Sequence, residues 1–173
     1  MSRNIGVIGL GAMGYGVAQS LLRAGFNVHA FDLREEVLRR FAEAGGTPCG
    51  SPAELGERCD VVITLVVNAA QTETVLFGEQ GAVSKMTAGK LVIASATVPP
   101  GFAEALGKRL GERGLLMLDA PVSGGAARAA ESVRRHVIAT LHNNGLRLSR
   151  DASAGSRQIS TGTVPNVRRC WRR

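Results

Sequence analysis

The stretch that decides the fold reads Asn4-Ile5-Gly6-Val7-Ile8-Gly9-Leu10-Gly11-Ala12-Met13-Gly14 and lies near the start of the 173-residue chain. Its first half is a short apolar run, and its second half has the glycine spacing G-x-G-x-x-G. Apolar residues then recur at helical spacing, at positions Val17, Ala18, Leu21 and Leu22. The pattern predicts a strand, a tight glycine turn and a helix, in that order.

The residues that follow give the glycine turn its context. Gly25 ends the helix, and Phe26 to Asp32 form a second predicted strand with an acidic residue at its end. Three glycines after one strand and an acid after the next are the arrangement of a dinucleotide-binding βαβ unit. A P-loop is excluded because no Gly-Lys-Ser/Thr follows the glycines.

Each glycine of the turn has a predicted mechanical role. Gly9 permits the sharp turn, Gly11 lets the backbone approach a pyrophosphate, and Gly14 lets the helix pack closely on the strand. The pyrophosphate would then bind the free N–H groups at the start of the helix, around Ala12 and Met13, where the helix dipole also favours an anion.

Asp32 bears on the choice of coenzyme. Its carboxylate accepts hydrogen bonds from the adenosine ribose hydroxyls and repels a 2′-phosphate, so NAD is favoured over NADP. Arg34 weakens this preference, because an arginine two residues further on could also bind a 2′-phosphate. Alternatively, Arg34 is a solvated residue at the start of the next helix.

Strands and helices alternate along the rest of the chain up to Glu131. This alternation predicts an α/β domain with a doubly wound, mostly parallel Rossmann sheet and helices on both faces. The β-branched run from Asp60 to Val67 is typical of a central strand covered on both faces. Further helices are expected at Glu35 to Ala44, after Ser51-Pro52, at Ala69 to Leu76 and at Pro100 to Arg113, and further strands at Leu91 to Ala94 and Leu115 to Leu118.

The net charge of +7 is concentrated at the end of the chain. Residues 1–131 contain 12 Lys and Arg against 13 Asp and Glu, whereas residues 132–173 contain 9 against 1. This last part lacks a sustained apolar period, so we expect a domain over 1–131 and a basic, disordered tail over 132–173. Trp171 is the only aromatic residue of the tail, which argues against a nucleic-acid-binding surface.

From the remaining composition we expect a cytoplasmic protein. The longest apolar run, Val61 to Val67, is too short to span a membrane, and the N-terminus lacks a secretory signal. Cys49, Cys59 and Cys170 are expected to be reduced thiols, and their spacing does not predict a metal site.

Four stretches together resemble the N-terminal half of the 3-hydroxyacid dehydrogenases, which include 3-hydroxyisobutyrate dehydrogenase, tartronate semialdehyde reductase and L-threonate dehydrogenase. The L-threonate branch is the nearest. The stretches are Gly9 to Gly14, Val66-Val67-Asn68-Ala69-Ala70-Gln71, Ala94 to Pro100, and Asp119-Ala120-Pro121-Val122-Ser123-Gly124-Gly125. The likeness covers Met1 to about Glu131 and implies hydride transfer between a small hydroxy acid and NAD.

The resemblance also implies roles for single residues. The loop containing Val66, Val67 and Asn68 would line the coenzyme cleft together with Thr97, and Ser123, Gly124 and Gly125 would bind the substrate carboxylate. Taken without the family, Asn68 caps the next helix, Thr97 shapes a turn before Pro99, and the Ser-Gly-Gly segment is a flexible turn.

The sequence departs from the family after Glu131. The resemblance implies a small-residue turn and a strand after Gly125, then a long helix bearing the lysine that serves as acid and base, and a helical second domain that mediates dimerisation. The chain has only Lys85, Lys90 and Lys108, all before Ser123. Residues 132–173 resemble translation in a shifted reading frame. We therefore expect no catalytic residue and no turnover by this chain alone; the alternative is a non-catalytic dinucleotide-binding module.

Overall fold

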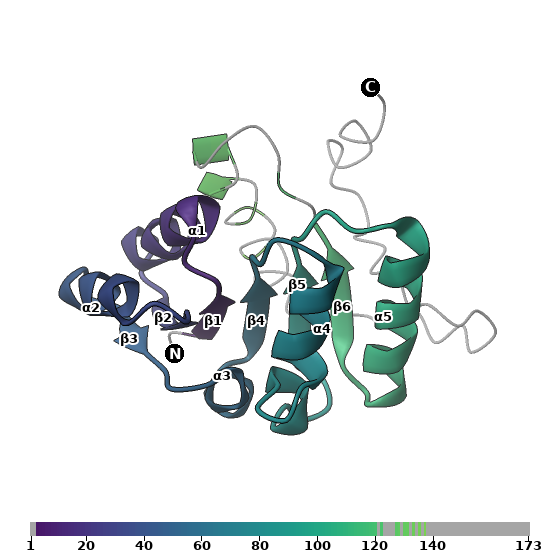
Figure 1. Ribbon diagram of the computed structural model, residues 1–173. Coiled ribbons are helices and arrows are strands. Elements are labelled where there is room, and N and C mark those ends of the chain that lie inside the picture. Colours follow the sequence, from purple (N-terminus) through teal and green to yellow (C-terminus); the bar gives the residue numbers. More distant parts are fainter. Residues whose placement is uncertain are drawn as a thin grey trace.

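The computed structural model describes residues 3–120 together with residues 122, 127–128, 130–131, 133, 135 and 137. Six parallel strands form one sheet in the order β3-β2-β1-β4-β5-β6. This order and the alternation with helices confirm the predicted doubly wound α/β fold (Figure 1). The strands are β1 (Asn4–Ile8), β2 (Asn27–Phe31), β3 (Thr47–Pro48), β4 (Val61–Thr64), β5 (Leu91–Ala94) and β6 (Leu116–Asp119).

Helices cover both faces of the sheet and create two apolar layers. On one face, α1 (Ala12–Arg23) and α2 (Glu35–Glu43) bury Leu21 and Phe41 against β1 and β2. On the other face lie α3 (Pro52–Arg58), α4 (Ala69–Phe77), the short 3-10 helix η1 (Ala82–Ser84) and α5 (Pro100–Glu112). In Figure 1, α4 stands in front of β5, and α5 lies beside the edge strand β6. No described helix is long and apolar enough to cross a membrane.

The predicted and observed elements differ mainly at their ends. Strand β4 stops at Thr64, three residues before the predicted end at Val67, because its neighbours end there: Thr64 pairs with Ile8 on β1 and with Ala94 on β5. The two-residue strand β3 and helix η1 were not predicted. Thr47 and Pro48 are both exposed, so β3 has no apolar pattern that could indicate a strand.

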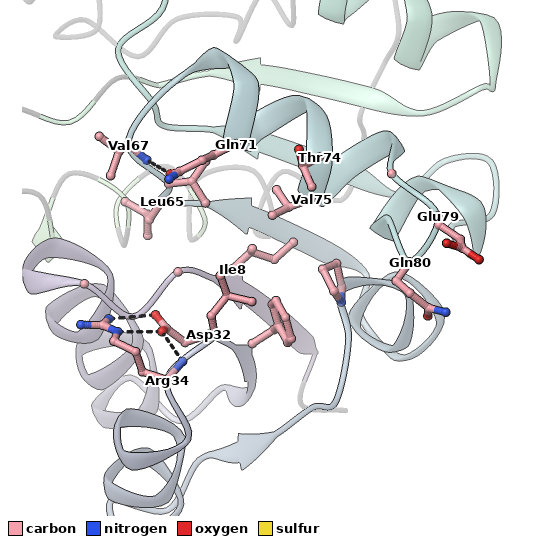
Figure 2. A pocket seen from close by; sticks show the side chains of 17 residues that line it. Ile8, Asp32, Arg34, Leu65, Val67, Gln71, Thr74, Val75, Glu79 and Gln80 are labelled. Carbon is pink, nitrogen blue, oxygen red and sulfur yellow. Dashed lines mark hydrogen bonds and ion pairs between the residues drawn. The ribbon is translucent and has the colours of Figure 1, made fainter.

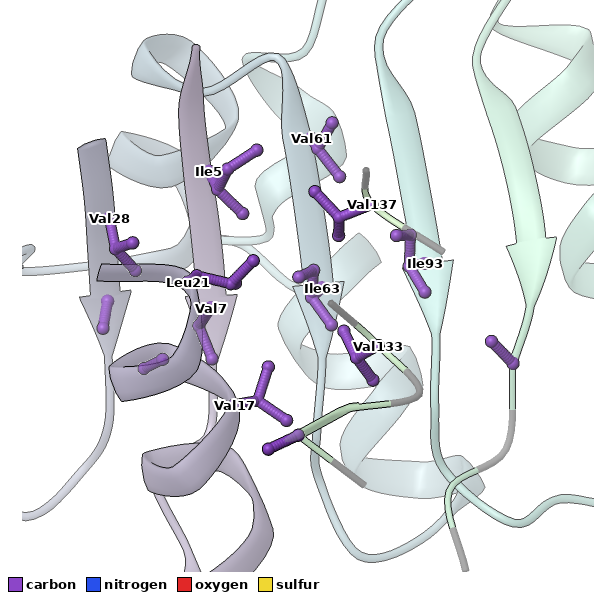
Figure 3. Close-up of a cluster of buried hydrophobic side chains, with 14 of the residues drawn as sticks. Ile5, Val7, Val17, Leu21, Val28, Val61, Ile63, Ile93, Val133 and Val137 are labelled. Atoms are coloured by element: carbon purple, nitrogen blue, oxygen red, sulfur yellow. The ribbon is translucent and has the colours of Figure 1, made fainter. Parts of the chain in front are cut away.

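The hydrophobic core extends past the predicted domain boundary at Glu131. The described residues between 127 and 137 are helical, and Val133 and Val137 are fully buried. Figure 3 shows them beside Val61 and Ile63 of β4 and Ile93 of β5, within the same apolar cluster as α1. Residues 138–173, the rest of the predicted tail, lie outside the described part.

This helix corrects the strand that the family resemblance implied directly after Gly125. Ala127, Arg128, Ala130 and Glu131 adopt helical backbone. Alanine has the highest helix propensity, and Ala130, Val133 and Val137 recur at the spacing of one helix face. A segment with these residues buries its apolar side chains more completely as a helix on the sheet than as a further strand.

Candidate functional site

The candidate site lies at the carboxyl ends of β1 and β4, where the strand order reverses. Chain connections leave these two strands toward opposite faces of the sheet, and the gap between them is where open α/β sheets bind ligands. A cavity of about 600 Å³ opens there (Figure 2). Its walls come from the β1–α1 turn, the end of β2, the β4–α4 loop and one face of α4.

The three glycines of the turn meet different surroundings. Gly9 has a φ of 92°, and a Cβ atom there would lie 2.7 Å from the Leu65 carbonyl oxygen. A Cβ at Gly14 would lie 1.8 Å from the Gly9 carbonyl oxygen, whereas one at Gly11 would meet no described atom within 4 Å. Gly9 and Gly14 therefore serve the packing of the turn, and Gly11 leaves open space above the backbone.

Helix α1 begins directly beneath that open space. Gly11 is its N-cap, and among the described residues no side chain caps the helix and no acidic residue lies in its first turn. The first intrahelical bond comes from the Tyr15 N–H, which donates to the Gly11 carbonyl at 3.0 Å. The N–H groups of Ala12 and Met13 thus point toward the site with the positive end of the helix dipole behind them. Such a terminus fits the pyrophosphate of a dinucleotide.

Asp32 follows β2 and faces the same turn. Its Oδ2 accepts a hydrogen bond from the Leu10 N–H at 2.7 Å, which ties the carboxylate to the glycine turn. The Arg34 guanidinium donates from Nε to Oδ1 at 2.9 Å and from Nη2 to Oδ2 at 3.0 Å. These bonds outweigh the effect of burial and lower the pKa of Asp32 below its ordinary value of 3.8. Asp32 is therefore a carboxylate at neutral pH, as a ribose acceptor must be.

The predicted residues of the β4–α4 loop divide between the cavity and the surface. Val66 and Val67 line the cavity, and Val67 is 80% exposed. Asn68 is the N-cap of α4, where its Oδ1 accepts a hydrogen bond from the Gln71 N–H at 2.9 Å. The capping role considered for Asn68 is therefore present. Thr97 is exposed, three residues beyond the end of β5.

Several cavity residues were missed from the sequence. One face of α4 contributes Gln71, Thr74 and Val75, whose spacing of three and four residues could have indicated a shared helix face. Gln71 also accepts a hydrogen bond from the Val67 N–H through its Oε1, at 2.9 Å. The remaining lining residues not predicted are Ile8, Phe31, Leu33, Pro52, Leu65, Gly78, Glu79 and Gln80.

The two described cysteines, Cys49 and Cys59, are buried. Burial raises the pKa of Cys49 to about 11 and that of Cys59 to about 12, so both free thiols are protonated and unreactive at neutral pH. The described residues contain no cluster of metal-ligating side chains. The predicted carboxylate-binding residues Ser123, Gly124 and Gly125 lie outside the described part of the chain.

Two relatives and one solved structure resemble this chain closely. L-threonate dehydrogenase of Cupriavidus necator is 84% identical over 130 residues, which are 75% of this chain and 44% of that protein. The enzyme of the same name from Haemophilus influenzae is 43% identical over 127 residues, or 73% of this chain and 42% of that protein. The crystal structure of a 3-hydroxyisobutyrate dehydrogenase from Salmonella typhimurium superposes with a TM-score of 0.71 at 38% identity, covering 75% of this chain and 45% of that one.

The chain thus spans less than half the length of the curated relatives it matches. Its similarity to a family model, in contrast, covers most of the chain. That model describes the NAD binding domain of 6-phosphogluconate dehydrogenase and matches residues 4–137, which include the glycine turn, Asp32 and the buried helix that contains Val133 and Val137. By this match over the whole described core, the chain belongs to the family of NAD binding domains represented by that of 6-phosphogluconate dehydrogenase.

Proposed function

We propose that this chain binds NAD as the coenzyme domain of a 3-hydroxyacid dehydrogenase. The observation that carries the proposal is the uncapped start of α1 beneath the open space at Gly11. The N–H groups of Ala12 and Met13 would hold the pyrophosphate, and Asp32 would accept the adenosine ribose hydroxyls. The apolar walls formed by Val66, Val75 and Phe31 suit the flat adenine ring.

The nicotinamide half would lie on the other side of the glycine turn. Met13 lies in the first turn of α1, Asn68 directly precedes α4 and Thr97 follows β5, and all three are exposed. We assign them to the nicotinamide and its ribose. The Asn68 Oδ1 already caps α4, so its side-chain NH₂ group is the part that would donate to the coenzyme.

The substrate in this proposal is a small hydroxy acid, with L-threonate favoured by the relatives named above. Bound NAD would supply the hydride acceptor, and the protein must supply a base for the hydroxyl proton. The three lysines of the chain do not provide one. Lys90 donates through Nζ to the Gly56 and Glu57 carbonyls, both at 2.8 Å, and no lysine lines the described cavity. We therefore propose that this chain binds coenzyme but does not oxidise hydroxy acids alone.

A titration of the full chain with NADH tests the binding half of the proposal. NADH fluorescence should increase to saturation and NAD should compete with it, because both place the same pyrophosphate on α1. A folded sample that shows no saturable signal with millimolar NADH or NADPH contradicts the proposal. Circular dichroism on the same sample establishes that the protein is folded.

An assay with L-threonate and NAD tests the catalytic half. We expect no production of NADH above the rate without protein, because the base is missing. Sustained turnover would show that another residue takes the proton and that the chain is an enzyme by itself. Binding without turnover also fits the second candidate, a non-catalytic dinucleotide-binding module. Turnover restored by adding the family's lysine-bearing helical domain as a separate chain would favour the dehydrogenase.

The buried free thiols Cys49 and Cys59 suit a reducing compartment, and on this ground we propose a cytoplasmic location.

A further inference from the structure

The carboxylate of Asp32 can accept only a limited number of hydrogen bonds. A carboxylate offers about four acceptor positions, two on each oxygen. Four donors already use them in the structure. Oδ2 accepts from Leu10 N–H and from Arg34 Nη2, at 2.7 and 3.0 Å. Oδ1 accepts from the Arg34 N–H and from Arg34 Nε, at 3.0 and 2.9 Å. No position remains for the hydroxyl groups of a ribose.

The four donors are of two kinds. The main-chain N–H groups of Leu10 and Arg34 are fixed by the fold. The other two donors belong to the guanidinium, which is a side-chain group that can rotate away. A ribose presents two neighbouring hydroxyls, so it needs the same number of acceptor positions as the guanidinium uses. Figure 2 shows Arg34 beside Asp32 at the wall of the cavity, with dashed lines for these bonds.

The ion pair is weak enough to be displaced by a ligand. The side chain of Arg34 is 57% exposed, whereas that of Asp32 is 9% exposed. A half-exposed ion pair is well screened by water, and its arginine regains hydration when it leaves. Asp32 in contrast stays anchored by Leu10 N–H and keeps its place at the turn.

We propose that the Arg34 guanidinium competes internally for the ribose subsite, so that the coenzyme binds when its 2′- and 3′-hydroxyls replace Nε and Nη2 on Asp32. This inference rests on the proposed coenzyme site. Arg34 lowers the affinity for NAD, because part of the binding energy is used to displace it. Once displaced, it is a cation within reach of a 2′-phosphate, so it also reduces discrimination against NADP. Glu35 and Glu36 in the first turn of α2 keep the local charge negative, which preserves the preference for NAD.

Titrations of the full chain with NADH and with NADPH, followed by fluorescence and by calorimetry, test this role. Arg34→Ala should bind NADH about three- to five-fold more tightly than the wild type, the range expected when a partly exposed ion pair no longer competes. The same variant should bind NADPH more weakly. Arg34→Lys keeps the charge but cannot use both carboxylate oxygens as a planar fork, so NADH should again bind more tightly while NADPH binding is retained.

Arg39→Ala is the matched control. It removes the same charge from α2, the helix that Arg34 precedes, at an exposed position that does not line the cavity. Its NADH affinity should equal that of the wild type. If Arg39→Ala and Arg34→Ala change NADH binding equally, net charge explains the effect and the competition is disproved.

A coenzyme analogue locates the effect at the ribose. With the 2′-deoxyadenosine analogue of NADH, which has one hydroxyl fewer at this subsite, the gain from Arg34→Ala should be smaller than with NADH. Unchanged or weaker NADH binding by Arg34→Ala overturns the inference while leaving the proposed function intact. Absence of NADH binding by the wild type and by every folded variant overturns both.

Discussion

Gly11 and Gly14 belong to the same turn, yet a methyl group would have opposite effects at the two positions. At Gly14 it would overlap the Gly9 carbonyl oxygen, so Gly14→Ala must push α1 away from β1. We expect a loss of about 3 kcal/mol in unfolding free energy, at the upper end for overpacked sites. At Gly11 the backbone angles suit alanine and no described atom is near, so Gly11→Ala should cost less than about 1 kcal/mol.

The two variants separate stability from binding. Gly11→Ala should lower NADH affinity by about ten-fold or more, because its methyl group enters the space assigned to the pyrophosphate. Denaturant unfolding gives the stability of each variant, and fluorescence titration gives the affinity. Normal NADH affinity in a stable Gly11→Ala protein would mean that the pyrophosphate does not lie over this turn.

His29 should make stability depend on pH. Burial, with a smaller contribution from Arg58, lowers the pKa of this histidine below its ordinary value of 6.5, and its Nδ1 is buried without a hydrogen-bond partner among the described residues. The unfolded chain therefore takes up a proton more readily than the folded one. The stability is complete above about pH 6.5 and is lost as the pH falls toward the folded pKa.

Thermal melts at pH 7.5 and pH 5.5 test this expectation in the wild type and in His29→Phe. The wild type should lose more stability between the two values than the variant. The comparison isolates His29, because the carboxyl groups that also titrate in acid, such as Asp32 and Asp119, are common to both proteins. An equal loss in both proteins would assign the pH dependence to other groups.

The residues of the glycine turn were predictable because their roles are backbone roles. A G-x-G-x-x-G spacing after an apolar run specifies a turn with little help from the rest of the chain, and Asp32 is fixed by its place at the end of the next strand. The occupation of Asp32 by Arg34 was not predictable. It depends on a side-chain rotamer, and the sequence permitted either an inward or a solvated arginine.

Lys90 connects two elements that are distant in sequence. It precedes β5, and its Nζ donates to the carbonyls of Gly56 and Glu57 in the last turn of α3, at 2.8 Å each. A cation at a helix C-terminus satisfies carbonyls that have no intrahelical donor and interacts favourably with the dipole. Lys90→Met should therefore lower the unfolding free energy by about 1–2 kcal/mol.

Lys85→Met is the control for that variant, because Lys85 is exposed and its side chain makes no hydrogen bond or ion pair in the described part of the chain. Its effect should stay below about 0.5 kcal/mol. Denaturant unfolding measures the unfolding free energy of both variants. If the two variants lose the same amount, the hydrogen bonds from Lys90 to the end of α3 contribute no more to stability than the positive charge of any surface lysine.

The predictability of whole elements follows their apolar content. The predicted strand around Val61 and Ile63 was found because every side chain of β4 is buried, and the run is dense in β-branched residues. Its end was misplaced, since the sequence does not reveal where β1 and β5 stop pairing. Strand β3 was not predicted because both of its residues are exposed, so no apolar side chain marks it in the sequence. It is held to β2 by backbone pairing.

The extent of the domain was the least predictable property of the chain. The arginine-rich composition after Glu131 suggested that the core ends there. The exposed side of the segment is indeed charged: the Arg135 side chain is 76% exposed and forms an ion pair with Glu131 at 2.7 Å. Among the described residues of this segment, the buried side carries Ala130, Val133 and Val137. Three apolar residues at helical spacing are easily overlooked among charges, although they suffice to cover the sheet face over β4 and β5.

The contribution of this helix can be measured directly. Replacing Val133 or Val137 by alanine removes two methyl groups from a fully buried position, and each change should cost about 1.5–2.5 kcal/mol. The two side chains are one helical turn apart, so the double variant tests whether their losses add. Arg135→Ala, on the exposed side of the same helix, should cost less than about 0.5 kcal/mol. If the two valine variants lose unfolding free energy and Arg135→Ala does not, this segment is part of the folded NAD-binding unit. If the double variant melts like the wild type and binds NADH equally well, the stable unit ends near Glu131, and the charge pattern of the sequence marked its boundary correctly.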